Sequence, residues 1–469
     1  MKNIKLKKVK SIFLGIIAIS VTMVSCNQTN ESSDKNEDWI PLFDGETLDG
    51  WKVVGGEANY EVEDGAIVGT MTKGVPNSFL TTEETYSDFI LELDFKLEGE
   101  STNSGIQVRS QIDEEANEGR GRVFGKQIEI DPTSRAWTGG VYDEARRGWI
   151  YPLDLNEEAK NAFKANEYNH VRIEAIGNEV RTWINDIPTS YVIDTLDDEG
   201  IIGLQVHSIP DELDGKKAYF KNIQIQTENF EPKTFPEDVY IVNLLENRLS
   251  DAEKEAGYTL LFNGNDAEGW RSADGDFFPD KGWTVGDGTI KVHSSDGGES
   301  TNGGDIVTDG QYSAFDLSFE FKMTPGANSG VKYFVTLEED THGSAIGLEY
   351  QILDDKLHPD AKMGKEGNRT LASLYDLITS NDDARARRDI GEWNRGRLVV
   401  EPDNKVTHYL NGIKMLEYVR GSQEYKDLVA GSKYKDWDNF GQAEEGHILL
   451  QDHGDEVYFR NIKIKDLKN

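Results

Sequence analysis

Short stretches of alternating apolar and polar residues dominate this chain, and Gly, Asn and Asp residues separate them. The clearest are Phe89–Leu97 (FILELDFKL) and Phe315–Met323 (FDLSFEFKM), in which every second residue is apolar. Val171–Asn185 and Arg397–Asn411 show the same alternation and run into Asn-Asp and Asn-Gly turns. A period of two places successive side chains on opposite faces of a β-strand. Because helical periodicity is scarce elsewhere, the pattern predicts an all-β protein built as a sandwich.

The alternating pattern occurs twice. The motif LFDG at 42–45, followed by Gly50-Trp51, returns as LFNG at 261–264, followed by Gly269-Trp270, and the similarity continues for the length of a domain. So long a period indicates two copies of one globular domain and not a solenoid of small units. The Gly-Trp pairs are better explained as core anchors than as sugar-stacking platforms.

The repeat and its flanking segments predict the domain organisation. We expect one jelly-roll sandwich at residues 39–227 (copy one) and a second at 257–469 (copy two), each large enough to bury its own core. Residues 228–256 are expected to form a linker with one short helix. Ser250 and Glu253 have the spacing of a capping box, and Gly257 follows as a helix stop.

The first 25 residues have the features of a signal peptide. Lysines precede an apolar run that ends at Val24 and is too short to span a bilayer. The run leads to Cys26, the only cysteine, in a sequence that resembles a bacterial lipoprotein cleavage site. We therefore expect Cys26 to be lipidated, residues 26–38 to be a flexible tether, and the protein to be anchored in the envelope of a Gram-negative bacterium, in the periplasm or on the outer surface. An ordinary secretory signal with an incidental cysteine is the alternative.

The charge of the chain limits its partners. The formal net charge is -36 at pH 7, and removal of the lysine-rich leader makes the remainder still more acidic. Nucleic acid is excluded as a partner, because its phosphates would be repelled. A neutral ligand such as a sugar is compatible with this surface.

One strand in each copy carries an acid beside an amide. In residues 347–352 of copy two, Glu349 and Gln351 alternate with apolar residues and share a face, about 7 Å apart along the strand. Copy one keeps the alternation but reverses the order, so that Gln127 and Glu129 share a face. A solvated outer strand would show the same pattern.

A second strand favours a functional site. Gln205 and His207 face away from the predicted core in copy one, and copy two repeats the pair as Gln451 and His453. Imidazole is the side chain best matched to proton transfer near neutral pH. A structural histidine remains the alternative.

Two further elements accompany these strands. Asn103-Ser104-Gly105 and Asn328-Ser329-Gly330 read as tight turns into a strand, which could hold an Asn amide at the edge of a cleft. A phenol and a carboxylate follow the acid-amide strand in each copy, as Tyr142-Asp143 and Tyr375-Asp376, where they could meet a sugar hydroxyl.

Six motifs in order resemble a known family. GLEYQILDD, SLYDLI, GEWNRGRLVV, YLNG, GHILLQDHG and VYFRNIKI run through copy two, and copy one matches through LFDG, NSGIQVR, GGVYDEARRGW and EYNHVRIEA. Together they resemble the 3-keto-disaccharide hydrolase domain family across nearly the whole mature chain.

The resemblance implies a fold and a reaction. The expected fold is two tandem concanavalin A-like jelly-roll β-sandwiches. The expected reaction cleaves glycosides whose carbon 3 a partner sugar 3-oxidoreductase has already oxidised to a ketone. The ketone acidifies the proton on carbon 2, so a base can remove it; the group on carbon 1 then leaves, and water adds back. This needs a base, a stabiliser for the enolate oxygen and a proton donor.

The resemblance also implies roles for particular residues. The catalytic candidates are Glu349, His453 and Asp376 in copy two and Glu129, His207 and Asp143 in copy one. The substrate-binding candidates are Gln351, Tyr375, Asn328 and Lys332 in copy two and Gln127, Tyr142, Asn103 and Arg109 in copy one. Copy two has Phe334 where copy one has Arg109, so if Arg109 steadies the enolate, copy two lacks that group unless Lys332, at a neighbouring position, takes its place.

Other functions stay open at this point. A divalent cation could stabilise an enolate among Glu, Asp and His side chains, although no ligand spacing is specific enough to identify a metal site. The sandwich also suits a non-catalytic, lectin-like glycan-binding lipoprotein. Hydrolysis of unoxidised sugars by paired carboxylates is a third possibility. One copy could bind while the other reacts.

Overall fold

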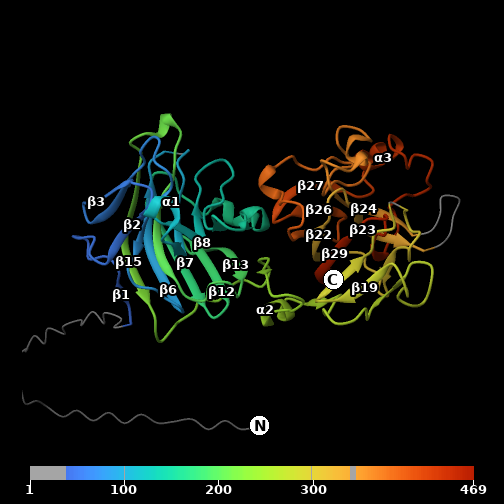
Figure 1. Cartoon of the computed structure of the whole chain (residues 1–469), viewed down its shortest axis with the longest axis horizontal. Helices are drawn as coiled ribbons and strands as arrows, with labels where there is room; N and C mark the ends of the chain where they lie inside the picture. The colour runs from blue at the N-terminus through green and yellow to red at the C-terminus, as the bar shows by residue number, and fades with distance from the viewer. Residues whose placement is uncertain (1–37, 100, 297, 338–344, 469) are drawn as a thin grey trace, which may run out of the picture. The chain divides into compact units, whose positions relative to one another are not determined.

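The computed structural model describes residues 38–99, 101–296, 298–337 and 345–468 (Figure 1). The predicted signal peptide, the predicted lipid acceptor Cys26 and all but the last residue of the predicted tether lie outside these ranges. Within them, no helix is long and apolar enough to cross a membrane.

Copy one is a sandwich of two antiparallel sheets. The larger sheet has the strand order β16 (Val242–Asn243), β13 (Ile187–Ile193), β12 (Glu179–Ile184), β11 (Asn169–Ile176), β6 (Phe89–Leu97), β15 (Lys217–Gln226), β4 (Ala66–Thr70) and β3 (Asn59–Glu63), with β1 (Ile40–Pro41) beside β15. The smaller sheet has the order β10 (Gly148–Tyr151), β9 (Val141–Glu144), β8 (Arg122–Ile130), β7 (Ser104–Asp113), β14 (Ile201–Val206), β5 (Ser78–Thr82) and β2 (Trp51–Gly55). In this body only β16, which comes from the predicted linker, pairs in parallel among the described strands.

Copy two repeats this architecture. Its larger sheet has the order β19 (Trp283–Gly286), β20 (Thr289–Val292), β29 (Val457–Asp466), β22 (Phe315–Met323), β25 (Asn394–Val400), β26 (Lys405–Leu410) and β27 (Ile413–Val419), with β17 (Tyr258–Leu260) beside β29. Its smaller sheet has the order β18 (Trp270–Ser272), β21 (Ile306–Thr308), β28 (His447–Leu450), β23 (Asn328–Thr336) and β24 (Ile346–Leu353). The prediction of an all-β protein with two tandem sandwiches is confirmed.

Helices are few and short in the described ranges. The α-helices are α1 (Ala116–Gly119), α2 (Asp251–Glu255) and α3 (Gln423–Ala430), and the 3-10 helices are η1 (Leu153–Leu155), η2 (Glu157–Asn161), η3 (Asp211–Leu213), η4 (Pro359–Lys362) and η5 (Ala384–Ala386). The linker helix α2 begins at the predicted capping box, in which Ser250 and Glu253 bind each other's backbone N–H groups. This short helix lies within residues 228–256, and the linker itself stays a prediction.

The alternating stretches form strands because they bury one face. The apolar side chains of β6 and β22 are almost fully buried, and both strands have the predicted bounds. Two longer alternating stretches each divide into a hairpin. Val171–Asn185 turns at Gly177, and Arg397–Asn411 turns at Asn404, where both residues take the left-handed backbone conformation.

Candidate active site

A cavity of about 280 Å³ lies in copy two, and we call it the copy-two cavity. Of the seven residues predicted for this copy, six line it: Asn328, Lys332, Glu349, Gln351, Tyr375 and His453. They meet because β23 pairs with both β24 and β28, which bring the acid-amide strand and the Gln-His segment to the same sheet. Their placement agrees with the prediction, and their roles remain predictions.

Glu349 is a buried carboxylate surrounded by positive groups. It lies on β24 directly opposite Lys332 of β23 and is 7% exposed. Burial raises the pKa of Glu349, and the positive charges of Lys332, Lys433 and His453 oppose that rise. Lys332 Nζ also lies 3.4 Å from a carboxylate oxygen of Asp305, which fixes its position. A carboxylate with a raised pKa in a cavity is suited to general-base chemistry.

The glycine of each Asn-Ser-Gly motif makes room for a side chain of the site. A Cβ on Gly330 would lie 2.7 Å from Glu349 Oε1, and a Cβ on Gly105 would lie 2.3 Å from Gln127 Cδ. The preceding serines tie the strands together, since Ser329 Oγ donates to the Gln451 carbonyl at 2.8 Å and Ser104 Oγ donates to the Gln205 carbonyl at 2.7 Å. The motif begins a strand, β7 or β23, and does not form the predicted tight turn; its glycine opens space beside the neighbouring strand.

Several polar atoms around the copy-two cavity lack partners among the described residues. They are Asn328 Oδ1, both side-chain polar atoms of Gln351 and Gln451 Oε1. A buried polar atom without a hydrogen bond costs roughly 1–3 kcal/mol. A ligand that carries several hydroxyl groups would satisfy these atoms.

Aromatic side chains also line the copy-two cavity, and none of them was predicted from the sequence. Tyr434, Trp437 and Phe440 follow α3, and the rings of Tyr434 and Phe440 stack with centroids 3.8 Å apart. Lys433 lies in the same segment, 4.2 Å from the centre of the Tyr375 ring, and burial lowers its pKa. The sequence KYKDWDNF at 433–440 carried the signal, because it mixes aromatic and charged residues outside any alternating strand.

Asp376 lies apart from the other candidates of copy two, and its catalytic role stays an untested prediction. Its carboxylate receives a hydrogen bond from Arg369 Nε at 2.7 Å and another from the backbone N–H of Lys433 at 2.8 Å, and it does not line the copy-two cavity. Asp376 thus holds the segment that carries Lys433. The Tyr375 hydroxyl donates to Asp360 at 2.8 Å, so Tyr375 offers the cavity its ring more than its phenol.

Five of the seven residues predicted for copy one line a second cavity, and residues from outside copy one line it as well. The five are Asn103, Gln127, Glu129, Tyr142 and His207, and we call this the copy-one cavity. The acid and the imidazole of each copy therefore share a cavity, as expected. Arg135 and Trp149 of copy one also line it, and neither was predicted.

A chain of hydrogen bonds fixes the carboxylate of Glu129. Ser110 Oγ donates to Gln107, Gln107 Nε2 donates to Gln127, and Gln127 Nε2 donates to Glu129 Oε2 at 2.9 Å. Asn103 Nδ2 donates to the other oxygen of Glu129 at 2.6 Å. Burial raises the pKa of Glu129 to about 7, although these hydrogen bonds oppose the rise. Glu129 can therefore exchange a proton near neutral pH.

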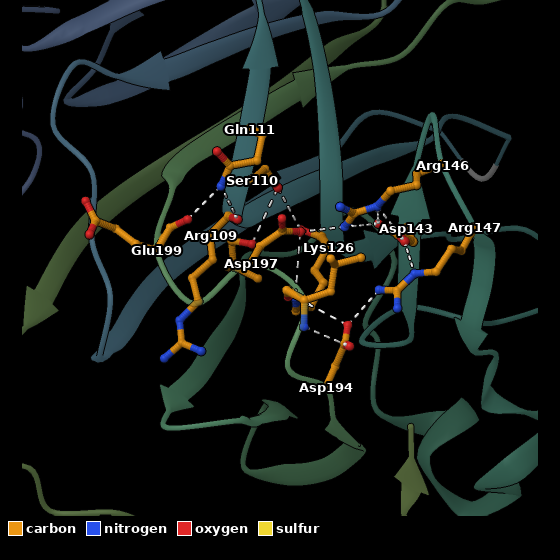
Figure 2. A network of polar contacts seen from close by, with 12 residues as sticks. Arg109, Ser110, Gln111, Lys126, Asp143, Arg146, Arg147, Asp194, Asp197 and Glu199 are labelled. Carbon is orange, nitrogen blue, oxygen red and sulfur yellow. Dashed lines mark hydrogen bonds and ion pairs between the residues drawn. The ribbon is translucent and has the colours of Figure 1, made fainter. Parts of the chain in front are cut away.

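Arg109 does not reach the copy-one cavity, which contradicts its predicted contact with substrate. Its backbone has a φ of 48° at a bulge in β7, and this turns the side chain to the other side of the strand. There the guanidinium donates to the carbonyls of Ser87, Gly177 and Ala175 and to Asp88. Figure 2 shows it pointing away from the cluster around Asp143. Phe334 has the same backbone conformation in copy two.

Asp143 is a second correction in copy one, because it belongs to a buried ionic network and does not line the cavity (Figure 2). Its carboxylate pairs with both Arg146 and Arg147. The other members of the network are Lys126, Asp194 and Asp197. Alternation along β9 explains this placement, since Tyr142 faces the cavity and the next residue must face the other way.

The two cavities carry their acid at different strand positions. Glu129 lies opposite Gly105, the position that Gln351 occupies opposite Gly330 in copy two. Glu349 instead lies opposite Lys332. The reversed order seen in the sequence is therefore a real shift of the carboxylate along the strand.

No group of three or more His, Cys, Asp or Glu side chains in the described part of the chain is arranged to hold a metal ion. The polar groups around both cavities are amides, ammonium and guanidinium groups, imidazoles and isolated carboxylates. The residues present therefore give no preformed site for the divalent cation considered from the sequence.

Comparison with known proteins gives consistent matches. The family model described as "3-keto-alpha-glucoside-1,2-lyase-like domain" matches residues 38–226 and 257–465. A 3-keto-disaccharide hydrolase of Bacteroides thetaiotaomicron is 37% identical over 232 residues, which cover 45% of this chain and 79% of that protein. The crystal structure of a proposed glycosyl hydrolase from Parabacteroides distasonis is 34% identical, with a TM-score of 0.40, and covers 48% of this chain and all of that one. A second such structure from the same organism is 26% identical, with a TM-score of 0.34, and covers 45% of this chain and 99% of that one.

Proposed function

Because the chain belongs to the family of 3-keto-alpha-glucoside-1,2-lyase-like domains, we propose that it is a carbohydrate-active enzyme that cleaves 3-keto-glycosides, 3-keto-disaccharides among them. We assign the reaction to the copy-two cavity. One observation carries this assignment: a buried carboxylate, Glu349, shares a small cavity with two ammonium groups and an imidazole.

Glu349 is the base in this proposal. It removes the proton from carbon 2 of the sugar, and the electron pair of that C–H bond moves toward carbon 3 to form an enolate. Lys332 lies opposite Glu349 and Lys433 also lines the cavity, so both can stabilise the negative oxygen. Positive groups held in a water-poor site stabilise such a charge far better than water does.

His453 is the proton donor for the second half of the reaction. The enolate re-forms the ketone, a double bond forms between carbons 1 and 2, and the bond from carbon 1 to the leaving oxygen breaks. The leaving oxygen takes a proton from His453, whose Nε2 lies 3.9 Å from the carboxylate of Glu299. Water then adds to carbon 1 and a proton returns to carbon 2, so that the net reaction is hydrolysis.

The rest of the copy-two cavity suits a sugar. Tyr434 and Trp437 offer flat apolar rings for the C–H face of a pyranose. The unpaired amide atoms of Gln351 and Asn328 can bind its hydroxyl groups. The same features would serve a lectin-like binding protein, which is the second candidate function.

The test is the turnover of 3-keto-glycosides by Glu349→Gln. We expect glucose release from 3-keto-trehalose, and from a panel of 3-keto-glucosides, with a fall of about 10²- to 10⁴-fold in kcat on the substrates that copy two processes. Glu424→Gln, on the exposed surface of α3, is the matched control and should behave as wild type. No turnover by the wild-type protein would favour the lectin-like function, and full turnover by Glu349→Gln on every substrate would remove copy two from the reaction.

We also propose that Cys26 carries a lipid and anchors the enzyme in the cell envelope, where a sugar 3-oxidoreductase supplies the ketone. The support is the leader sequence and the need for an oxidised substrate. Cys26→Ser should shift the protein from the membrane fraction to the soluble fraction. Retention of this variant in the membrane fraction would contradict the proposal.

A further inference from the structure

Copy one carries the parts of a catalytic site in an arrangement of its own. We propose that the copy-one cavity is a second catalytic site, with Glu129 as base and Arg135 as the cation, and that it accepts a different 3-keto-glycoside from the copy-two cavity. This inference rests on the proposed function.

Arg135 supplies the positive charge that Arg109 does not. It lies in the loop between β8 and β9, lines the copy-one cavity, and its charge acts on both Glu129 and His207. Its guanidinium is held by Asp131, whose oxygen lies 2.8 Å from Arg135 Nε, and by the Trp137 ring, with a centroid distance of 5.1 Å. A planar cation held in this way is pre-organised to bind an oxyanion.

The hydrogen bonds of His207 define its part in the reaction. Its Nδ1 lies 2.5 Å from the Ser208 carbonyl oxygen, which can only accept, so Nδ1 carries the proton. In the neutral ring Nε2 is then an acceptor, suited to orient the water that adds to carbon 1. Burial, together with the nearby charge of Arg135, lowers the pKa of His207 and favours this neutral form.

The remaining steps balance as in copy two. Glu129 takes the proton from carbon 2, and Arg135 stabilises the enolate oxygen at carbon 3. The bond from carbon 1 to the leaving oxygen breaks as the ketone re-forms. Tyr142 lines the cavity, and burial raises its pKa, so its hydroxyl keeps a proton that it can give to the leaving oxygen.

The position of the acid indicates a different substrate. Glu129 lies two residues further along its strand than Glu349 does, a distance of about 7 Å. A sugar whose carbon 2 lies next to Glu129 must therefore bind about one pyranose ring away from the position that corresponds to the copy-two substrate. It also meets other rings, since Tyr142 and Trp149, with centroids 5.2 Å apart, line this cavity. The aromatic segment at 433–440 belongs to copy two.

The experiment compares variants of the full chain on a substrate panel. The panel contains 3-keto-trehalose and 4-nitrophenyl 3-keto-glucosides of α and β configuration. We expect Glu129→Gln to lose about 100-fold in turnover on one subset of the panel and Glu349→Gln to lose a similar factor on another. The double variant should lose turnover on both subsets of the panel. Thermal melting curves like that of the wild type show that each variant is folded.

Variants of Arg135 test the cation separately. Arg135→Ala should lower kcat on the same subset as Glu129→Gln, and Arg135→Lys should recover part of the loss because it restores the charge. Wild-type turnover by Glu129→Gln on every substrate, with all turnover lost in Glu349→Gln, would overturn the inference and leave the proposed function intact. Equal losses across the whole panel in both single variants would also overturn it. No turnover by the wild-type chain would instead contradict the proposed function.

Discussion

The two cavities are built on equivalent strands and motifs, but they differ in their charged groups. Both copies keep the Asn-Ser-Gly motif, the serine that ties two strands together, and the glutamine that precedes a histidine. They differ in which strand position holds the acid and in the cations near it, which are Arg135 of a loop in copy one and Lys332 of β23 with Lys433 of a loop in copy two. The comparison teaches that the repeated strands fix the place of a site, whereas the position of the acid on its strand and the residues of the surrounding loops determine what the site binds.

The largest expected effect is a loss of stability on substitution of Arg109, which would distinguish a structural role from a role in substrate binding. Arg109→Leu should lower the free energy of unfolding of copy one by about 3 kcal/mol, at about 1 kcal/mol for each of three carbonyl groups that lose a donor. Chemical denaturation measures the loss. Arg120→Leu, which replaces a side chain that is 46% exposed, should change the free energy of unfolding little. A stable Arg109→Leu protein with a raised KM would restore Arg109 to the substrate site.

The next largest effect is expected at Gly330, which leaves space for the side chain of the proposed base, Glu349. Gly330→Ala would bring a Cβ within 2.7 Å of Glu349 Oε1, so the carboxylate must move. We expect kcat to fall by about 100-fold on the substrates of copy two, because small displacements of a catalytic group are costly. Gly286→Ala, where a Cβ would meet nothing within 4 Å, is the control. Unchanged kcat in Gly330→Ala would show that Glu349 is not held in place by this contact.

A smaller effect is expected when an aromatic residue that lines the copy-two cavity is replaced. Trp437→Ala should raise KM for copy-two substrates by about 10-fold, corresponding to the roughly 1–3 kcal/mol of apolar contact that a large side chain supplies. Trp149→Ala, in the copy-one cavity, should leave those substrates unaffected. If the two variants raised KM equally on every substrate, the two cavities would not differ in their binding surfaces.

The smallest expected effect is a loss of stability when the serine that joins two strands is replaced in either copy. Ser329→Ala and Ser104→Ala each remove one buried hydrogen bond between strands, and each should lower the free energy of unfolding by about 1 kcal/mol. Matching losses, measured by denaturation, would support an equivalent frame in the two copies. A large loss in one copy alone would show that the serines have different structural roles.

Local sequence patterns were enough to predict the strands and the grouping of most candidates. Phe89–Leu97 and Phe315–Met323 form strands with the predicted bounds because burying one face of a strand requires that alternation. Glu349 and His453 line the same cavity, as the alternation predicted, although β28 ends at Leu450 and His453 lies just beyond it.

Other residues could not be placed from the sequence. Arg109 lies in a β-bulge, where its left-handed backbone conformation interrupts the alternation and reverses the direction of the side chain. Arg135, Lys433 and Trp437 lie in loops, which have no periodicity, and only tertiary packing brings them to the cavities. Asp143 could have been excluded, since alternation with Tyr142 already placed it on the opposite face.

The central claim is that the reaction begins with removal of the proton on carbon 2. Turnover of 3-keto-trehalose in D₂O tests this claim most directly, with early samples of the released 3-keto sugar analysed by mass spectrometry and NMR. Samples without enzyme correct for spontaneous exchange. We predict one deuterium at carbon 2 of the released 3-keto-glucose, formed at the rate of turnover and lost together with turnover when both Glu349 and Glu129 are replaced by Gln. Cleavage at full rate with hydrogen retained at carbon 2 would contradict the account and indicate direct displacement at carbon 1.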